Sequence, residues 1–194
     1  NDQVLLAGFS PGGTSLLPDS QYVSAAQGAQ GLAEGGLGKF DQVELRKALT
    51  GKVAAASAWV GELEEGVYGS ASPQDLETMF QLVYLNMTAP RADEAAFAAW
   101  KKRAKTMLEN RLARPETVFS DKLQVTLAQG HFRRRPMSPE LLDEIDLKVA
   151  ESTFRERFAD AGQFTFGIVG AFKIDDIRPF VLAYLGALPS AGRR

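Results

Sequence analysis

An apolar stripe in the middle of the chain restricts the possible folds more than any other feature. It recurs with the spacing of one face of an α-helix, and Ser72-Pro73-Gln74-Asp75 stands directly before it. Ser72 can accept the first free amide hydrogens of a helix, and Pro73 suits its first position. The pattern predicts an amphipathic helix that ends at Thr88-Ala89-Pro90 and packs these residues in a core: Leu76, Met79, Phe80, Val83, Tyr84 and Met87.

Strand patterns lie on both sides of this helix in the sequence. Residues 4–10 read as a buried strand, residues 52–60 and 63–70 as a hairpin around Gly61-Glu62, and residues 163–169 as an alternating strand. Few helical crossovers separate these strands, which argues against a doubly wound sheet. The sequence therefore predicts an α+β fold with a curved, mostly antiparallel or mixed sheet covered by helices.

Further helices are expected around these strands. One runs from a cap at Asp19 or Ser20 to Ala33, one covers about 42–49, and one starts at Asp93 and breaks at Pro115. Others reach about residue 129, begin at Ser138-Pro139-Glu140, cover 147–158, and close the chain. The helix from Asp93 should direct these residues inward: Phe97, Trp100, Ala104, Met107 and Leu108.

Length and charge narrow the class of protein. The chain has 194 residues, which suits a single domain over 1–194, and a net charge of -2 with both signs mixed. A nucleic-acid partner is not expected without a basic face. Arg133-Arg134-Arg135 is interpreted as a solvated loop, the alternative being a binding patch. No apolar run is long enough to span a membrane, so a membrane partner is not expected either.

Few residues could carry catalysis. The chain has no cysteine and one histidine, His131, whereas zinc hydrolase sites use several imidazole or thiolate ligands. A Ser-His-Asp triad is formally possible, but no serine lies in a G-x-S-x-G turn. His131 is interpreted as a loop residue that packs or caps.

The acidic residues and the glycine runs also lack a recognisable site pattern. The glycines at 12–13 and 35–38 match neither phosphate-binding motif and fit turns and a helix end. No catalytic, cofactor-binding or metal-binding residue is assigned. We expect the following acidic residues on solvated faces and at helix N-termini: Glu62, Glu64, Glu65, Asp75, Glu77, Asp143, Glu144 and Asp146.

Several segments, in order along nearly the whole chain, resemble the pitrilysin/insulinase family of zinc metallopeptidases. Each segment alone is weakly diagnostic, and the ordered set is more specific. The segments are Phe9-Ser10-Pro11-Gly12-Gly13-Thr14, Gly35-Gly36-Leu37-Gly38-Lys39-Phe40, Gly69-Ser70-Ala71-Ser72-Pro73-Gln74-Asp75-Leu76, Thr88-Ala89-Pro90-Arg91-Ala92-Asp93, and Arg157-Phe158-Ala159-Asp160 with Arg178-Pro179 and Leu188-Pro189.

The resemblance implies a particular fold and role. Single-chain members of the family hold four α+β domains in two halves that close around a peptide, and this pattern is most similar to the third domain of bacterial members. The catalytic domain carries H-x-x-E-H on the helix that corresponds to about 20–33 here. Residues 24–31 read Ser-Ala-Ala-Gln-Gly-Ala-Gln-Gly. They contain no histidine and no acid, so zinc and the water-activating glutamate are expected in the parent's catalytic domain.

The sequence thus predicts a non-catalytic domain of a zinc-dependent metalloendopeptidase that helps to form a closed peptide-binding chamber. Its expected partners are the other domains of the parent chain and, through the parent, a peptide substrate. One alternative is a separate non-catalytic subunit that pairs with an active one; another is a hydrolase that uses His131. The opening on Asn1-Asp2 before an apolar stretch suggests a fragment that lacks one or two N-terminal strands. The bacterial resemblance favours the periplasm.

Overall fold

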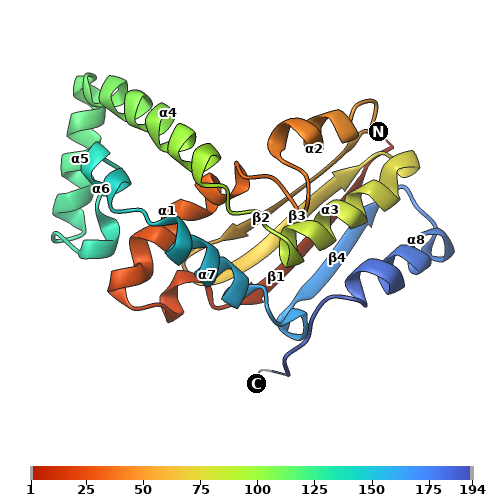
Figure 1. The fold of residues 1–194 in the computed structure, drawn as a ribbon. Coiled ribbons are helices and arrows are strands. Elements are labelled where there is room, and N and C mark those ends of the chain that lie inside the picture. Colours follow the sequence, from red (N-terminus) through yellow and green to blue (C-terminus); the bar gives the residue numbers. More distant parts are fainter. Residues whose placement is uncertain (1, 193–194) are drawn as a thin grey trace.

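The computed structural model describes residues 2–192, in which a four-stranded antiparallel sheet carries helices mainly on one side (Figure 1). The strand order is β2-β3-β1-β4, and every neighbouring pair is antiparallel. In the centre, Ala7 lies opposite Tyr68 of β3 and Gly167 of β4. The predicted α+β class is confirmed. The strands are β1 (Val4–Pro11), β2 (Ala54–Val60), β3 (Glu64–Ala71) and β4 (Thr165–Gly170).

The helices follow the predicted order. Short 3-10 turns connect several of them, and the last continues as a single π-helical turn over Val181–Leu185. None of the described helices is long and apolar enough to cross a membrane. The helices are α1 (Asp19–Ala33), α2 (Gln42–Ala48), α3 (Leu76–Thr88), α4 (Glu94–Leu112), α5 (Pro115–Leu127), α6 (Pro139–Asp143), α7 (Leu147–Arg157) and α8 (Ile174–Phe180).

The main core lies between α3 and the sheet. Met79, Phe80 and Val83 of the predicted stripe are fully buried, and they meet Val4 and Val67 of the central strands. Each such side chain contributes about 1.5–3 kcal/mol when it leaves water. The amphipathic pattern is therefore confirmed as the feature that fixes α3 to the sheet.

A second core joins α1, α4 and α6. Phe97 and Trp100 of α4 are buried there against Leu142 of α6. Leu108 is buried as predicted, but the prediction for Met107 is wrong, because its side chain is 71% exposed. The outer part of α4 runs out with α5 as an arm at one end of the molecule (Figure 1), and its Leu108 side packs in the second core while Met107 faces outward.

Two expected helix caps are wrong. α1 begins after Pro18 without a side-chain cap, and the Ser72 hydroxyl caps no amide. Ser72 instead donates to the Asp75 carboxylate at 3.0 Å, which also accepts the Val53 N–H at 2.8 Å and lies 3.2 Å from Lys52 Nζ. The hydrogen bond from Val53 is the main reason why the pKa of Asp75 lies below its usual value. Asp75 lies at the N-terminus of its helix, as expected, but it is buried and ties the start of β2 to the start of α3.

Candidate interaction surface

Helix α1 packs closely against its neighbours. A Cβ on Gly28 would lie 2.6 Å from the Ala150 side chain of α7, and one on Gly31 would lie 2.6 Å from the rings of Phe97 and Trp100. Ser24 is buried, and its hydroxyl accepts the N–H of Asp146 at 2.9 Å. Small residues therefore let α4 and α7 approach α1.

His131 caps a loop. Its Nδ1 accepts the backbone N–H of Arg133 at 3.2 Å, as expected for a capping loop histidine. The imidazole is thus engaged with the backbone of its own loop. Ser120 and Glu62 line the same hollow, but the Glu62 carboxylate is held by Arg134 Nη2 at 2.9 and 3.1 Å.

The structure offers no clustered metal ligands in the part of the chain that it describes. No group of three or more His, Cys, Asp or Glu side chains within residues 2–192 could hold a metal ion. The sequence analysis assigned no catalytic or metal-binding residue. The candidate functional features described below are surfaces.

The arginine run is only partly solvated: the Arg134 side chain is 57% exposed, whereas Arg133 is largely covered. Arg133 donates to the carbonyls of Thr14 and Leu17 at 3.1 and 2.7 Å and lies over the Tyr22 ring at 4.9 Å. Arg135 forms two hydrogen bonds with Glu144 at 2.9 and 3.0 Å, which raise its own pKa and lower the pKa of Glu144. These arginines connect the loop to the start of α1, the β2–β3 turn and α6.

The prediction that Glu65 lies on a solvated face or at a helix N-terminus is also wrong. Its side chain is 0% exposed and pairs with Arg157 of α7, with Nη2 at 2.9 Å and Nε at 3.2 Å from its two oxygens. The Gly13 N–H donates to the same carboxylate at 2.6 Å. A Cβ on Gly12, whose φ is 144°, would lie 2.4 Å from Arg157 Nη2. The pair therefore locks the turn after β1 to β3 and α7.

The side of the sheet opposite α3 is open and apolar. Leu5, Phe9, Tyr68 and Val169 point to this side and are 46–64% exposed. Directly opposed residues in a sheet share a face, and Leu5 opposes Val169 while Phe9 opposes Gly66 next to Tyr68. Together with Trp59 these four residues form the open sheet face. Single exposed apolar residues are ordinary, whereas a contiguous group marks an interaction surface.

Trp59 lies flat on this face. Its indole is 5.7 Å from the Tyr68 ring and nearly parallel to it, and a Cβ on Gly66 would lie 2.6 Å from the indole carbons. The glycine leaves the space that the ring occupies. Trp59 Nε1 is buried and has no hydrogen-bond partner among the described residues. An unpaired buried donor is costly and uncommon in folded proteins, so this indole lowers the stability of the domain in the structure described.

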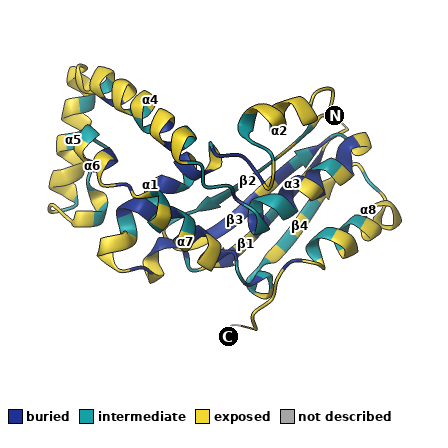
Figure 2. Ribbon diagram, viewed as in Figure 1, coloured by how far each residue is buried: buried dark blue, intermediate teal, exposed yellow. Residues whose placement is uncertain are grey.

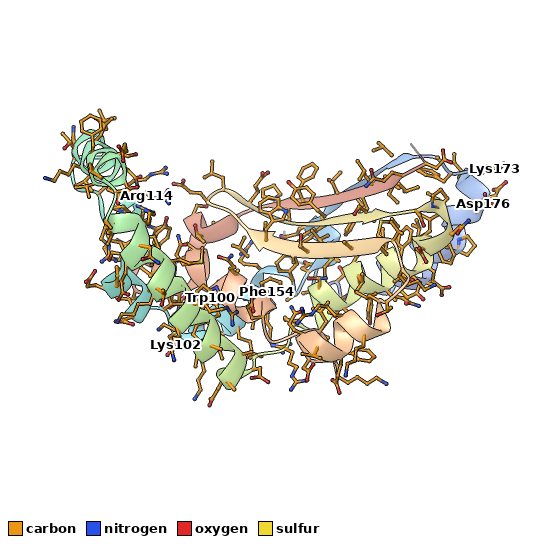
Figure 3. The ribbon with its side chains drawn as sticks, turned by 90° about the horizontal axis from the view of Figure 1, so that it is seen from above. Trp100, Lys102, Arg114, Phe154, Lys173 and Asp176 are labelled. Carbon is orange, nitrogen blue, oxygen red and sulfur yellow. The ribbon has the colours of Figure 1, made fainter. Side chains whose placement is uncertain are left out.

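Helix α5 is a second unpartnered surface. None of its residues is buried (Figure 2), and two of its large apolar side chains are highly exposed, Phe119 at 69% and Leu127 at 75%. A hydrogen-bonded ion pair between Arg111 and Asp121, with both oxygens at 2.6 Å, fixes α5 to α4. Figure 3 shows α5, which follows Arg114, rising at one end of the sheet on the side away from α3. The open sheet face and α5 therefore flank one corner of the molecule.

The sequence contained a signal for the open face. Residues 4–9 are apolar at both odd and even positions, which is typical of a strand covered on both faces. The structure covers the even positions with helices and leaves Leu5, Ala7 and Phe9 on the other side. The segment was interpreted as a buried strand, whereas in the structure only one side of it is buried.

Comparison with known proteins relates the chain to a protease in sequence. No family model matches the chain. A zinc protease PQQL-like protein of Arabidopsis thaliana is 29% identical over 192 residues, which are 97% of this chain and 17% of that protein. The chain therefore spans about one sixth of the length of this curated relative.

Solved structures share the fold. The periplasmic protease PqqL from Escherichia coli superposes with a TM-score of 0.79 at 19% identity, covering 100% of this chain and 21% of PqqL. The ferredoxin protease FusC in complex with Arabidopsis ferredoxin gives 0.73 at 16% identity, covering 98% of this chain and 21% of FusC. A protease from Helicobacter pylori gives 0.74 at 10%, covering 100% of this chain and 47% of that one.

These findings confirm the predicted relationship. In sequence the chain is related to a zinc protease, and in fold it is similar to PqqL-type peptidases, as the resemblance to the pitrilysin/insulinase family implied.

Proposed function

We propose that residues 1–194 form a non-catalytic domain of a zinc-dependent metalloendopeptidase. The observation that carries this proposal is a sequence match that runs over 97% of the chain yet covers only 17% of a zinc protease. Zinc in the parent would be held by a different domain, since α1 here places small residues and glutamines where the family places its ligands. By the resemblance, this domain corresponds to the third of four.

The role of the domain is to help close a peptide-binding chamber. The open sheet face and α5 are the surfaces through which it would contact the other domains of the parent. Both are apolar and lie at one corner of the molecule. A peptide substrate would reach this domain only through the assembled parent. The E. coli neighbour is a periplasmic protease, and we propose the same compartment for the parent.

A separate non-catalytic subunit that pairs with an active partner is the second candidate. The Helicobacter pylori neighbour supports it, because this chain covers 47% of that protein. One domain would make up about that fraction of a subunit that consists of two domains. A hydrolase built on His131 has less support, because its Nδ1 accepts a backbone N–H.

The size of the native gene product and its zinc content test these proposals together. A denaturing gel should show a band far above 21.0 kDa, near four domains for a single-chain peptidase and near two for a subunit. In that protein, His131→Ala should leave the zinc content and the chelator-sensitive peptidase activity unchanged. Tyr68→Asp, which places a charge on the open sheet face, should lower the activity and leave zinc bound, whereas Tyr68→Phe should do neither. Loss of zinc from His131→Ala would contradict the proposal.

A further inference from the structure

A hollow of about 450 Å³ lies between α5 and the segment that follows the arginine run. Its apolar walls are Leu112 at the end of α4, Val118 and Val125 of α5, and Pro136 with Met137 on the other side. Binding sites for small molecules typically measure about 300–1,000 Å³ and are lined mainly by apolar side chains with a few polar groups. The hollow therefore has the size and the lining of a small-molecule site.

Polar contacts hold the walls of this hollow in place. Arg111 Nη2 of α4 donates to both carboxylate oxygens of Asp121 of α5 at 2.6 Å, and Gln124 Nε2 donates to the Arg134 carbonyl at 2.9 Å. These contacts fix α5 to α4 at one end and to the arginine loop at the other. The apolar side chains of α5 that line the hollow stay 38% exposed, so an apolar ligand that covers them would gain free energy.

One polar group of the lining has no partner. The Asp121 carboxylate is occupied by its ion pair with α4, Thr126 Oγ1 donates to the Lys122 carbonyl at 2.8 Å, and Ser138 Oγ accepts the Leu141 N–H at 3.2 Å. Within residues 2–192, the ammonium group of Lys122 forms neither a hydrogen bond nor an ion pair. An unpaired positive charge therefore lies beside the apolar walls.

We propose that this hollow binds a small amphiphilic anion, a carboxylate on an aliphatic chain. The chain would cover the apolar walls, and the carboxylate would pair with Lys122, because opposite charges attract most strongly where apolar surface excludes water. The exposed Phe119 and Leu127 side chains of α5 do not line this hollow. The inference therefore does not depend on the contacts of α5 with other domains, nor on the zinc-peptidase proposal.

Isothermal titration calorimetry of this chain with decanoate, kept below its micelle concentration, tests the proposal. We expect saturable binding of one molecule per chain. Each CH₂ group that is removed should weaken binding by up to about fourfold, so octanoate should bind up to about 15-fold more weakly. Decyltrimethylammonium has the same chain length and the opposite charge, and it should bind more weakly than decanoate. Absence of saturable binding, or equal binding of the anion and the cation, overturns the proposal.

A first pair of variants tests the charge. Lys122→Gln removes the ammonium group and should weaken decanoate binding about two- to fivefold, the range for an ion pair that solvent reaches. Lys102→Gln is the matched control, because Lys102 is an exposed lysine of α4 outside the lining of the hollow (Figure 3). It should bind decanoate as the wild type does. Equal affinities of the two variants would overturn the assignment of the anion to Lys122.

A second pair tests the apolar wall. Val125→Asp places a carboxylate in the hollow and should weaken decanoate binding more than tenfold, whereas Phe119→Asp places the same group on α5 outside the lining and should leave it unchanged. Neither side chain is buried, so both variants should fold, and thermal unfolding checks this. Equal effects of the two substitutions would show that decanoate binds elsewhere and would overturn the proposal.

Other occupants of the hollow give different results. Phosphatidylglycerol vesicles offer an acyl chain and an anionic group in a membrane, and co-sedimentation of the chain with them, without binding of free decanoate, would assign the surface to a membrane. Self-association in analytical ultracentrifugation that Val125→Asp abolishes, again without decanoate binding, would assign it to a second copy. Either result overturns the proposal, whereas decanoate binding to a monomer supports it.

Discussion

Removal of the Arg157 side chain should destabilise the domain more than any surface change. Arg157→Met keeps the length of the aliphatic stem and deletes the guanidinium that pairs with Glu65. The Glu65 carboxylate, which is 0% exposed, would keep the Gly13 N–H at 2.6 Å as its remaining named partner. A buried charge without its counter-ion is strongly unfavourable, because the surrounding protein cannot replace its hydration.

The size of the effect follows from this geometry. Breaking a buried ion pair on one side costs about 3–5 kcal/mol. For a domain of this length, 1 kcal/mol corresponds to about 2–4 °C in Tm, so the Tm of Arg157→Met should fall by roughly 6–20 °C. The double variant Glu65→Gln with Arg157→Met removes both charges and keeps an oxygen for Gly13. It should be more stable than Arg157→Met alone.

Urea unfolding followed by circular dichroism measures these differences. Arg103→Met is the matched control, because Arg103 and Glu34 form an ion pair with exposed side chains, 58% and 41% accessible. Its loss should cost no more than about 1 kcal/mol. If Arg157→Met costs no more than this control, or if the double variant is less stable than Arg157→Met, the buried pair does not have the role argued above.

Three other substitutions test separate contacts. Asp75→Asn should lower stability at neutral pH. The pKa of Asp75 is lower in the folded state than its unfolded value of about 3.9. The ionised carboxylate therefore contributes fully to the free energy of unfolding above about pH 3.9, and this contribution is lost as the pH falls through the folded-state pKa. Urea titrations should show the stability difference between wild type and Asp75→Asn shrinking below about pH 4. Gly31→Val should cost about 1–3 kcal/mol through overpacking against Phe97 and Trp100, whereas equal stability would show that the helices separate freely. Arg133→Gln should accelerate limited proteolysis between α5 and α6, and an unchanged rate would contradict its tethering role.

The fold could be predicted because local patterns carried it. The α3 stripe, the hairpin around Gly61 and the proline at position 115 each act within a few residues, and the structure places an element boundary or a buried face at each of them. The prediction for Met107 was wrong because burial depends on what lies opposite: Leu108 meets the second core, whereas the neighbouring Met107 side chain faces outward.

The buried polar contacts could not be predicted with the same success, because the two residues of each contact are distant in sequence. Glu65 shares strand parity with Val67 and Ala71, which are both buried, so its inward position was visible in the pattern. Its partner Arg157 lies 92 residues away, and only the packing of α7 near β3 brings them together. The arginine run likewise required the tertiary placement of Thr14 and Leu17.

The candidate surface was missed for a related reason. Sequence patterns show which residues are apolar but not which protein covers them. Leu5 and Phe9 were assigned to a buried strand, and the helices of this chain reach only the other face of the sheet. The cover for the open sheet face is expected from another domain under the proposed function.

Metal content and peptidase activity of the purified 194-residue chain test the central claim most directly. The chain is incubated with zinc, desalted, analysed for bound metal and assayed with an unstructured peptide in the presence and absence of a chelator. A non-catalytic domain should retain no stoichiometric zinc and cleave nothing. One zinc per chain, or cleavage that the chelator abolishes, would contradict the proposal and direct attention to a site built from His131 and carboxylates.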